Sequence, residues 1–170
     1  MPWTALMYLP ATAPACLLTA GKGAKTAMII RKIQPEDYAA VAGFWRNYLE
    51  VPAATDECVS RTLERMNKDS HYFTFVAEEA GIVIGFITFV EVLSIDDPEG
   101  YIKINGIAVH PEYRSRGIGT QLIARAEQTA RERGSNSIGV ASIFKRTKAH
   151  DLYERLGYRK SAFWFHKNFD

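Results

Sequence analysis

The stretch that decides the fold runs from residue 107 to residue 120 and reads IAVHPEYRSRGIGT. Its first three residues are apolar and end a predicted strand, whereas Gly117 and Gly119 open a predicted amphipathic helix. Free backbone N–H groups at the start of a helix point toward an anion, and glycine lets the backbone approach that anion closely. Arg114 and Arg116 add positive charge beside these groups. The stretch therefore predicts a phosphate-binding turn between a strand and a helix.

Two common nucleotide-binding patterns do not account for the glycines. A dinucleotide fingerprint needs a third glycine three residues after the second, and Leu122 stands at that position. A Walker loop needs Gly-Lys followed directly by Ser or Thr, with another glycine five residues earlier, and the segment Gly21–Thr26 lacks this spacing. A glycine pair also begins many helices that bind nothing, so the rest of the chain has to decide.

Hydrophobic periodicity outside this stretch predicts strands and helices in mixed order. Strands are expected over 28–33, 72–77, 82–92, 101–109 and 137–142, with a last strand region over 158–169. Helices are expected from Pro35 to about Glu50, from a cap at Thr55 or Asp56 onward, over 117–133 and over 147–156. Residues 94–100 are expected to form a loop, and 79–81 a hairpin turn. Because several strands separate the helices, the fold class is mixed α/β (α+β).

Composition narrows the classes of protein that fit. A chain of 170 residues with 47% hydrophobic and 24% charged residues predicts one globular domain. A net charge of +2 gives no reason to expect a nucleic-acid or membrane partner. Cys16 and Cys58 form neither a disulfide framework nor zinc-ligand spacing, so a cytoplasmic protein without a metal site is expected.

Residues 1–27 differ from the rest of the chain, because they contain no acidic residue and three of the seven prolines. A secretory signal fits poorly, since no basic residue precedes Lys22 and Pro10 and Pro14 interrupt the apolar run. We interpret residues 1–27 as an N-terminal extension, with a targeting signal as the alternative, and expect the domain to occupy residues 28–170.

Residues 114–119, RSRGIG, resemble motif A of the Gcn5-related N-acetyltransferases (GNAT), whose pattern is Arg or Gln, any two residues, Gly, any residue, then Gly or Ala. Residues 149–158, AHDLYERLGY, are similar to motif B of the same family. With the element order, the resemblance covers about 140 residues. It implies the GNAT fold, with a mixed central sheet of six to seven strands, about four helices and a splayed parallel strand pair.

The resemblance also implies acetyl-CoA as the co-substrate, with its pantetheine arm between the splayed strands. Main-chain groups at the end of the preceding strand would meet the arm, and amides of the turn would hold the pyrophosphate. The residues implied in cofactor binding are Ile107, Ala108, Val109, Arg114, Ser115, Arg116, Gly117, Ile118, Gly119, Thr120 and Arg146. Arg146 stands where relatives often carry Asn, so it either meets the 3′-phosphate end of CoA or belongs to a solvated run of charge.

For catalysis, the resemblance places Tyr153 near the thioester sulfur as general acid, and packing on an apolar helix face is the alternative. Many relatives carry Glu as a base on the strand before motif A, but Asn105 and Gly106 stand there. Asn cannot take a proton, although it can orient a water molecule. We therefore hypothesise that Asn105 acts through water and that Glu91 is the best direct base, with a solvated strand end as the alternative for Glu91. His110 is expected to shape the turn.

In this family the acceptor binds against the first two helices and nearby loops. The corresponding residues here are Trp45, Tyr48, Glu50, Asp56, Glu57, His71 and the acidic loop 96–99. Acidic groups favour a cationic acceptor. The expected function is transfer of acetyl to a primary amine by direct attack in a ternary complex, with a small molecule or amino acid as acceptor. A protein or peptide acceptor, and a non-catalytic acyl-CoA-binding module, are the alternatives, and a homodimer is left open.

Overall fold

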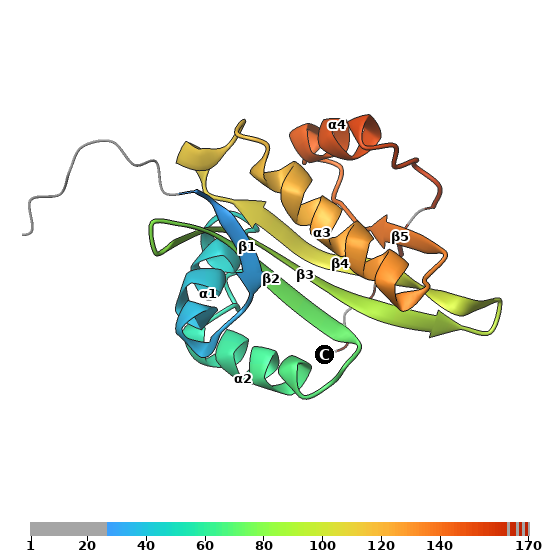
Figure 1. Ribbon diagram of the computed structural model, residues 1–170, viewed down its shortest axis with the longest axis horizontal. Coiled ribbons are helices and arrows are strands. Elements are labelled where there is room, and N and C mark those ends of the chain that lie inside the picture. Colours follow the sequence, from blue (N-terminus) through green and yellow to red (C-terminus); the bar gives the residue numbers. More distant parts are fainter. Residues whose placement is uncertain (1–26, 163, 166, 168, 170) are drawn as a thin grey trace, which may run out of the picture.

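The computed structural model describes residues 27–162 together with 164, 165, 167 and 169. Within them the chain forms one five-stranded sheet in the order β1-β2-β3-β4-β5, with α1 and α2 on one face and α3 on the other (Figure 1). All neighbouring strands are antiparallel except β4 and β5, which are parallel. The mixed α/β class predicted from the sequence is confirmed. Residues 1–26 of the predicted extension lie outside the described residues.

Most predicted elements are present. The strands are β1 (Ile29–Lys32), β2 (Tyr72–Glu79), β3 (Ile82–Ser94), β4 (Asp97–Val109) and β5 (Ser137–Val140). The helices are α1 (Tyr38–Asn47), which follows a 3-10 turn at Pro35–Asp37, α2 (Asp56–Asn67), α3 (Ile118–Arg133) and α4 (Thr147–Arg155).

Local chemistry sets the boundaries of these elements. The Thr55 side chain accepts a hydrogen bond from the Cys58 N–H and so caps α2. Of the two caps predicted for this helix, Thr55 and Asp56, it is therefore Thr55. Ala80 and Gly81 both have positive φ, which suits the two-residue turn that joins β2 to β3. At the end of α3, Gly134 has a φ of 76° and closes the helix in the left-handed conformation.

The sheet is buried on both faces, because side chains alternate along each strand. On the α3 face, Ile87 and Phe89 pack with Leu122 in one apolar cluster. On the α1/α2 face, Phe86 packs with Phe44 in a second cluster. The helices on the two faces therefore contact different residues of the same strands, and only side chains on the same face can lie together in one site.

Two predictions about elements are wrong. Residues 94–100 do not form a loop, because β3 and β4 continue to a tight turn at residues 95 and 96, with Ser94 opposite Asp97. Pro98 is accommodated because β5 joins β4 only from Tyr101 onward, so one edge of β4 needs no N–H donor at Pro98. The described residues of the region 158–169 form no strand, so the described sheet has five strands and not six to seven.

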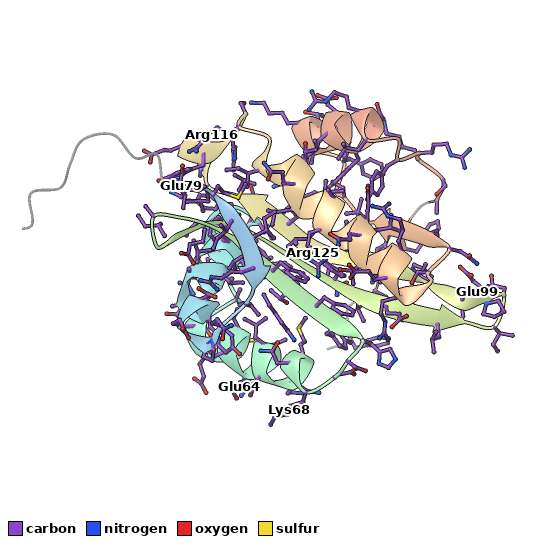
Figure 2. All side chains as sticks on the ribbon, viewed as in Figure 1. Glu64, Lys68, Glu79, Glu99, Arg116 and Arg125 are labelled. Carbon is purple, nitrogen blue, oxygen red and sulfur yellow. The ribbon has the colours of Figure 1, made fainter. Side chains whose placement is uncertain are left out.

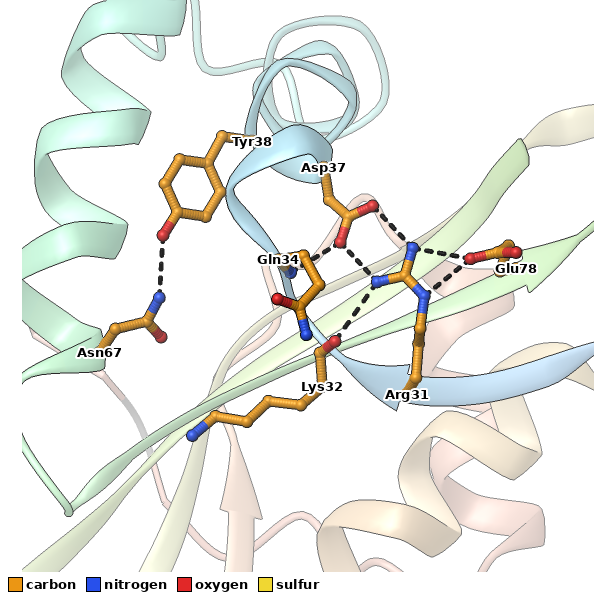
Figure 3. A network of polar contacts seen from close by, with 7 residues as sticks. All are labelled: Arg31, Lys32, Gln34, Asp37, Tyr38, Asn67 and Glu78. Carbon is orange, nitrogen blue, oxygen red and sulfur yellow. Dashed lines mark hydrogen bonds and ion pairs between the residues drawn. The ribbon is translucent and has the colours of Figure 1, made fainter. Parts of the chain in front are cut away.

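A charged network fastens the start of α1 to the sheet (Figure 3). The Arg31 guanidinium donates to Asp37 at 2.6 and 2.9 Å and to Glu78 at 2.7 Å, which joins β1, β2 and the turn before α1. The Gln34 N–H also donates to Asp37, at 2.8 Å. Burial of Asp37 disfavours its ionised form, but the hydrogen bonds from Arg31 and Gln34 outweigh burial and hold the pKa of Asp37 below its ordinary value of 3.8.

Replacement of Asp37 by Asn is expected to lower the free energy of unfolding by roughly 3 kcal/mol at pH 7, because it leaves Arg31 without its main partner. The pKa of Asp37 is lower in the folded than in the unfolded chain. The contribution of Asp37 to the free energy of unfolding of the wild type is therefore fully present above about pH 4, and it is lost as the pH falls through the folded-state pKa. Urea unfolding from pH 7 down to pH 2 measures both effects.

The matched control is Asp56→Asn, which breaks the exposed Arg46–Asp56 pair at 2.6 Å. Exposed pairs contribute little, so this variant is expected to unfold close to the wild type. Equal destabilisation by the two variants would contradict the importance assigned to the Asp37 network.

Candidate active site

The parallel strands β4 and β5 separate halfway along β4. Their pairing ends at Ile104 opposite Val140, whereas β4 continues to Val109 and remains paired with β3 on its other edge. No strand among the described residues pairs with this outer edge of β4 from residue 105 to residue 109. Main-chain N–H and C=O groups along the edge are thus available to another molecule. This is the splayed strand pair that the resemblance implies.

A β-bulge at Asn105 marks the point of separation. Gly106 lies opposite Thr88 and Ile104 opposite Phe89, so Asn105 is the extra residue in β4. A bulge of this kind turns two successive residues toward the same face. Accordingly Asn105 and Gly106 both meet the α1/α2 side, where Trp45 covers β4 so closely that a Cβ on Gly106 would lie 2.5 Å from the Trp45 ring.

The turn after β4 has the geometry of an anion site. Ser115 and Gly117 have φ angles of 61° and 77°, and α3 begins at Ile118 without a side-chain cap. Within the part of the chain that the structure describes, the six backbone amides from Ser115 to Thr120 donate to no carbonyl. Successive free amides of this kind, at the positive end of a helix, form a cradle for phosphate.

Two arginines of the turn are fixed by neighbours. Arg116 donates to both carboxylate oxygens of Glu79, at 2.9 and 2.7 Å, and Figure 2 shows the two residues side by side. Arg114 donates from Nε to the carbonyl of Val109 at 3.0 Å and lies over the ring of Tyr48. Arg114 therefore already occupies one of the main-chain groups predicted to meet the cofactor arm.

A pocket of about 690 Å³ lies between α1, α2 and the sheet. Its polar floor is formed by Asn105 and by Thr74 and Thr88, whose hydroxyls share a hydrogen bond of 3.0 Å. Its walls are mostly apolar and include Trp45 and Met66. Sequence reasoning missed Thr74 and Thr88. Hydroxyl residues inside otherwise apolar strands are the signal that could have found them.

Helix α4 lies against the start of α3, near the separated part of β4. The side chains of Leu152 and Val109 would lie 3.4 and 4.0 Å from a Cβ placed on Gly119. Arg146, the residue directly before α4, donates to the carbonyl of Leu49, just after the end of α1, at 2.8 Å. The helix that carries Tyr153 therefore spans from the phosphate cradle to the end of α1.

Tyr153 is suited to hold a proton at neutral pH. Burial raises the pKa of its phenol above the ordinary value of 10.0, and the positive charge of Arg146 opposes part of this rise. Its ring also packs beside that of Tyr158 at a centroid distance of 5.8 Å, and the Tyr158 hydroxyl donates to Glu127. Proximity to Arg146 places the predicted cofactor arginine beside the predicted acid.

Glu91 does not reach the pocket, which corrects the hypothesis of a direct base. Glu91 follows Ile87 and Phe89 at two-residue steps along β3 and therefore lies on the α3 face. There Arg133 Nε donates to its carboxylate at 3.0 Å, and the Glu91 side chain is only 7% exposed. Asn105 lines the pocket on the opposite face. The two residues proposed to share proton removal are therefore separated by the sheet. Glu91 is neither a solvated strand end nor a cleft residue.

The predicted acidic acceptor site is also not formed. Asp97 and Glu99 both accept from Asn136 at 3.0 Å, and Figure 2 shows Glu99 at the end of the β3–β4 hairpin, far from α1 and α2. Glu50 pairs with Lys145. Of the residues expected to bind the acceptor, Trp45 alone lines the pocket; Tyr48, Glu50, Asp56, Glu57 and His71 do not.

One carboxylate that the sequence did not single out does line the pocket. Asp69 follows α2, and His71 holds it through its backbone N–H at 2.9 Å and through its ring Nδ1 at 2.9 Å. These hydrogen bonds keep the pKa of Asp69 below its ordinary value. An Asp side chain that accepts a hydrogen bond from the backbone N–H two residues later forms a common type of turn. The sequence pattern is therefore compatible with a purely structural role and did not indicate a site.

Known proteins share this architecture. An aminoglycoside N-acetyltransferase solved in complex with CoA matches with a TM-score of 0.73 and 21% identity, over 89% of this chain and 99% of that one. The likeness shows that this chain has the fold of that enzyme. In the part of the chain that the structure describes, no helix is long and apolar enough to cross a membrane.

The sequence comparisons are more specific. The model of the Acetyltransferase (GNAT) family matches residues 35–158. An aminoalkylphosphonate N-acetyltransferase of Salmonella typhimurium is 31% identical over 130 residues, which are 76% of this chain and 81% of the relative. An L-amino acid N-acyltransferase of Escherichia coli is 28% identical over 148 residues, 79% of this chain and 81% of the relative. The chain belongs to the GNAT acetyltransferase family and is an N-acetyltransferase.

Replacement of Gly117 by Val is expected to weaken CoA binding at least tenfold, because a β-branched residue at a φ of 77° disturbs the turn that aims the free amides. Calorimetric titration with CoA measures the change.

Gly134→Val is the matched control. Gly134 has a φ of 76° at the opposite end of the same helix, and a Cβ would meet nothing within 4 Å at either glycine. Each variant is expected to lose about 1–2 kcal/mol of stability, but Gly134→Val keeps its CoA affinity. Loss of CoA binding in both would show that helix strain, and not the cradle, is responsible.

Proposed function

We propose that this N-acetyltransferase transfers the acetyl group of acetyl-CoA to the primary amine of a small molecule held in the pocket beside Asn105. The observation that carries the proposal is the position of the separated edge of β4. That edge adjoins the six free amides at one end and, through the bulge at Asn105, the pocket on the α1/α2 face. A donor and an acceptor bound in these two places would meet at β4.

The residues present fit acetyl-CoA. The amides from Ser115 to Thr120 offer six donors to a diphosphate, and the edge of β4 at Ile107 offers main-chain partners to an arm that carries amide groups. Arg116 lies beside the cradle, where its charge is paired with Glu79. When bound, acetyl-CoA would supply the activated acetyl group and a thiol leaving group.

The proton balance assigns roles to this chain's residues. In the overall reaction the amine nitrogen gains the acetyl group and loses one proton, while the sulfur of CoA gains one proton. Tyr153 holds a proton at neutral pH and lies on the helix next to the cradle, so it is the proposed donor to the sulfur. Burial raises the pKa of the Tyr153 phenol above its ordinary value of 10.0, so the phenol is protonated at neutral pH.

Proton removal from the amine is proposed to proceed through water. Asn105 is exposed to the pocket and its amide oxygen can accept a hydrogen bond from the amine or from a water molecule beside it. Among the described residues, Asp69 is the pocket's one carboxylate, and it is already hydrogen-bonded to His71. The proton therefore leaves to solvent through the open pocket and not to a fixed carboxylate.

The size of the pocket favours a small acceptor over a protein. A volume of about 690 Å³ lies in the range of small-molecule sites. The similar aminoalkylphosphonate and L-amino acid enzymes act, by their names, on small amines. Release of CoA thiol in the presence of a panel of small amines tests the proposal, and CoA binding without turnover on any amine or peptide would instead favour a non-catalytic module.

Tyr153→Phe is expected to lower kcat by about 10²-fold with little change in KM, because the leaving sulfur loses its proton donor. In the wild type the alkaline fall in kcat should lie above pH 10, since the pKa of Tyr153 is raised above 10.0, and it should disappear in the variant. Tyr158→Phe makes the same chemical change on the neighbouring ring and should retain near wild-type kcat. Unchanged kcat in Tyr153→Phe would leave Tyr153 with a packing role.

Asn105→Ala is expected to lower kcat/KM about tenfold and to move the acidic limb of its pH profile. The variant no longer positions the water molecule that accepts the proton from the amine, and such a water provides part of the rate gain of a general base. Glu91→Gln is the comparison variant. It should reduce thermal stability through the Arg133 pair but leave the pH profile in place. A shifted acidic limb in Glu91→Gln would restore Glu91 as the base.

A further inference from the structure

Burial does not hold the phosphate cradle in shape. Residues 114–117 are all exposed, and a Cβ on Gly117 would meet nothing within 4 Å. Ser115 nevertheless has a φ of 61°, in the left-handed region that residues other than glycine rarely adopt. The amides of the cradle also have to point the same way if they are to share one anion. Contacts other than burial therefore have to fix the backbone on both sides of Ser115.

The two arginines that flank Ser115 supply these contacts. Arg114 donates to the Val109 carbonyl at 3.0 Å, which closes the turn onto the end of its own strand. Arg116 donates to both carboxylate oxygens of Glu79, at 2.9 and 2.7 Å. The first contact is local, whereas the second ties the turn to β2, a strand that lies elsewhere in the sequence.

Glu79 is a firm anchor for the turn. It is the last residue of β2, it is paired with Ile82 across the hairpin, and its side chain is 19% exposed. Two parallel hydrogen bonds between a guanidinium and a carboxylate fix the orientation of both groups. The Tyr113 ring also lies 5.2 Å from the Arg116 guanidinium. Because the carboxylate of Glu79 balances the charge of Arg116, little of that charge is left to attract a phosphate.

We propose that Glu79 is a positioning residue for the acetyl donor. Through Arg116 it holds the cradle in the shape that a diphosphate needs, so Arg116 contributes its own backbone N–H and not its charge. The proposal rests on the proposed function, because it takes residues 115–120 to bind the diphosphate of CoA. It revises the expectation from motif similarity that Arg116 binds the cofactor through its side chain.

Calorimetric titration with CoA measures the effect without turnover. Glu79→Ala is expected to weaken CoA binding about tenfold, because binding then has to order a turn that is preorganised in the wild type. Arg116→Ala should weaken CoA binding equally, and the double variant should lose no more affinity than either single variant. An exposed ion pair contributes little to folding, so all three variants should unfold close to the wild type.

A donor without a diphosphate separates the cradle from the rest of the site. Glu79→Ala should raise KM for acetyl-CoA about tenfold and leave kcat nearly unchanged, because the lost interaction is made equally before and during acetyl transfer. Acetyl-pantetheine lacks the diphosphate, so its kcat/KM should be the same in the variant and in the wild type. A general disturbance of the site would instead lower kcat/KM for both donors and would contradict the proposal.

Glu78→Ala is the matched control. It removes the neighbouring carboxylate of β2 and changes the net charge equally, but Glu78 pairs with Arg31 on β1 and not with the turn. This variant should lose stability and keep the wild-type affinity for CoA. An equal loss of CoA affinity in Glu78→Ala would assign the effect to net charge and overturn the role of Glu79.

The remaining outcomes are distinct. Unchanged or tighter CoA binding in Glu79→Ala would overturn the inference, because it would make Arg116 a direct phosphate ligand that Glu79 restrains. Additive losses in the double variant would overturn it as well, since the two residues would then act independently. A wild type that binds CoA but acetylates no amine, together with weaker CoA binding in Glu79→Ala, would support the inference and overturn the proposed function.

Discussion

The separation of β4 from β5 after Ile104 and Val140 is the constraint on which the rest of the site depends. Backbone polar groups inside a protein are nearly always paired, so an unpaired strand edge next to buried structure requires a partner. Two helices lie beside this edge: the start of α3, where Gly119 approaches Val109, and the end of α1, where Trp45 covers Gly106. The first carries the backbone amides of residues 115–120, which donate to no carbonyl in the described part of the chain, and the second borders the pocket. The sheet itself stays intact because β3 follows β4 along its whole length.

Much of this arrangement could be predicted from the sequence because it depends on local rules. The cap at Thr55, the left-handed Gly117 before α3 and the glycine that ends α3 are dictated by a few neighbouring residues. Motif similarity extended these local rules to the family. The strand expected after Tyr158 rested on aromatic composition, which cannot show whether a neighbouring strand is present to pair with it, and the described residues of that region form no strand.

The side of the sheet on which a residue lies could not be predicted, because it depends on register. Alternation along β3 puts Glu91 toward α3, and the bulge at Asn105 resets the alternation in β4 by one residue. A sequence gives no direct sign of that bulge, so Glu91 and Asn105 were grouped together although the sheet divides them. The prediction that the acidic residues 96–99 bind the acceptor was wrong for a related reason. These residues lie at the start of β4, whereas the pocket meets β4 at Asn105, several residues further along the strand.

The pocket wall on α2 has a consequence for how such a protein can change. Side chains such as Cys58 and Thr62 border open space, so a substitution there alters the shape of a cavity already present and does not open a new void in packed core. Leu63, one residue further along, also lines the pocket, but it is buried and packs in the apolar cluster on the α1/α2 face of the sheet. Residues of α2 that border the pocket without being buried can therefore change the shape of the pocket at little cost in folding free energy, whereas a change at Leu63 affects the pocket and the core together.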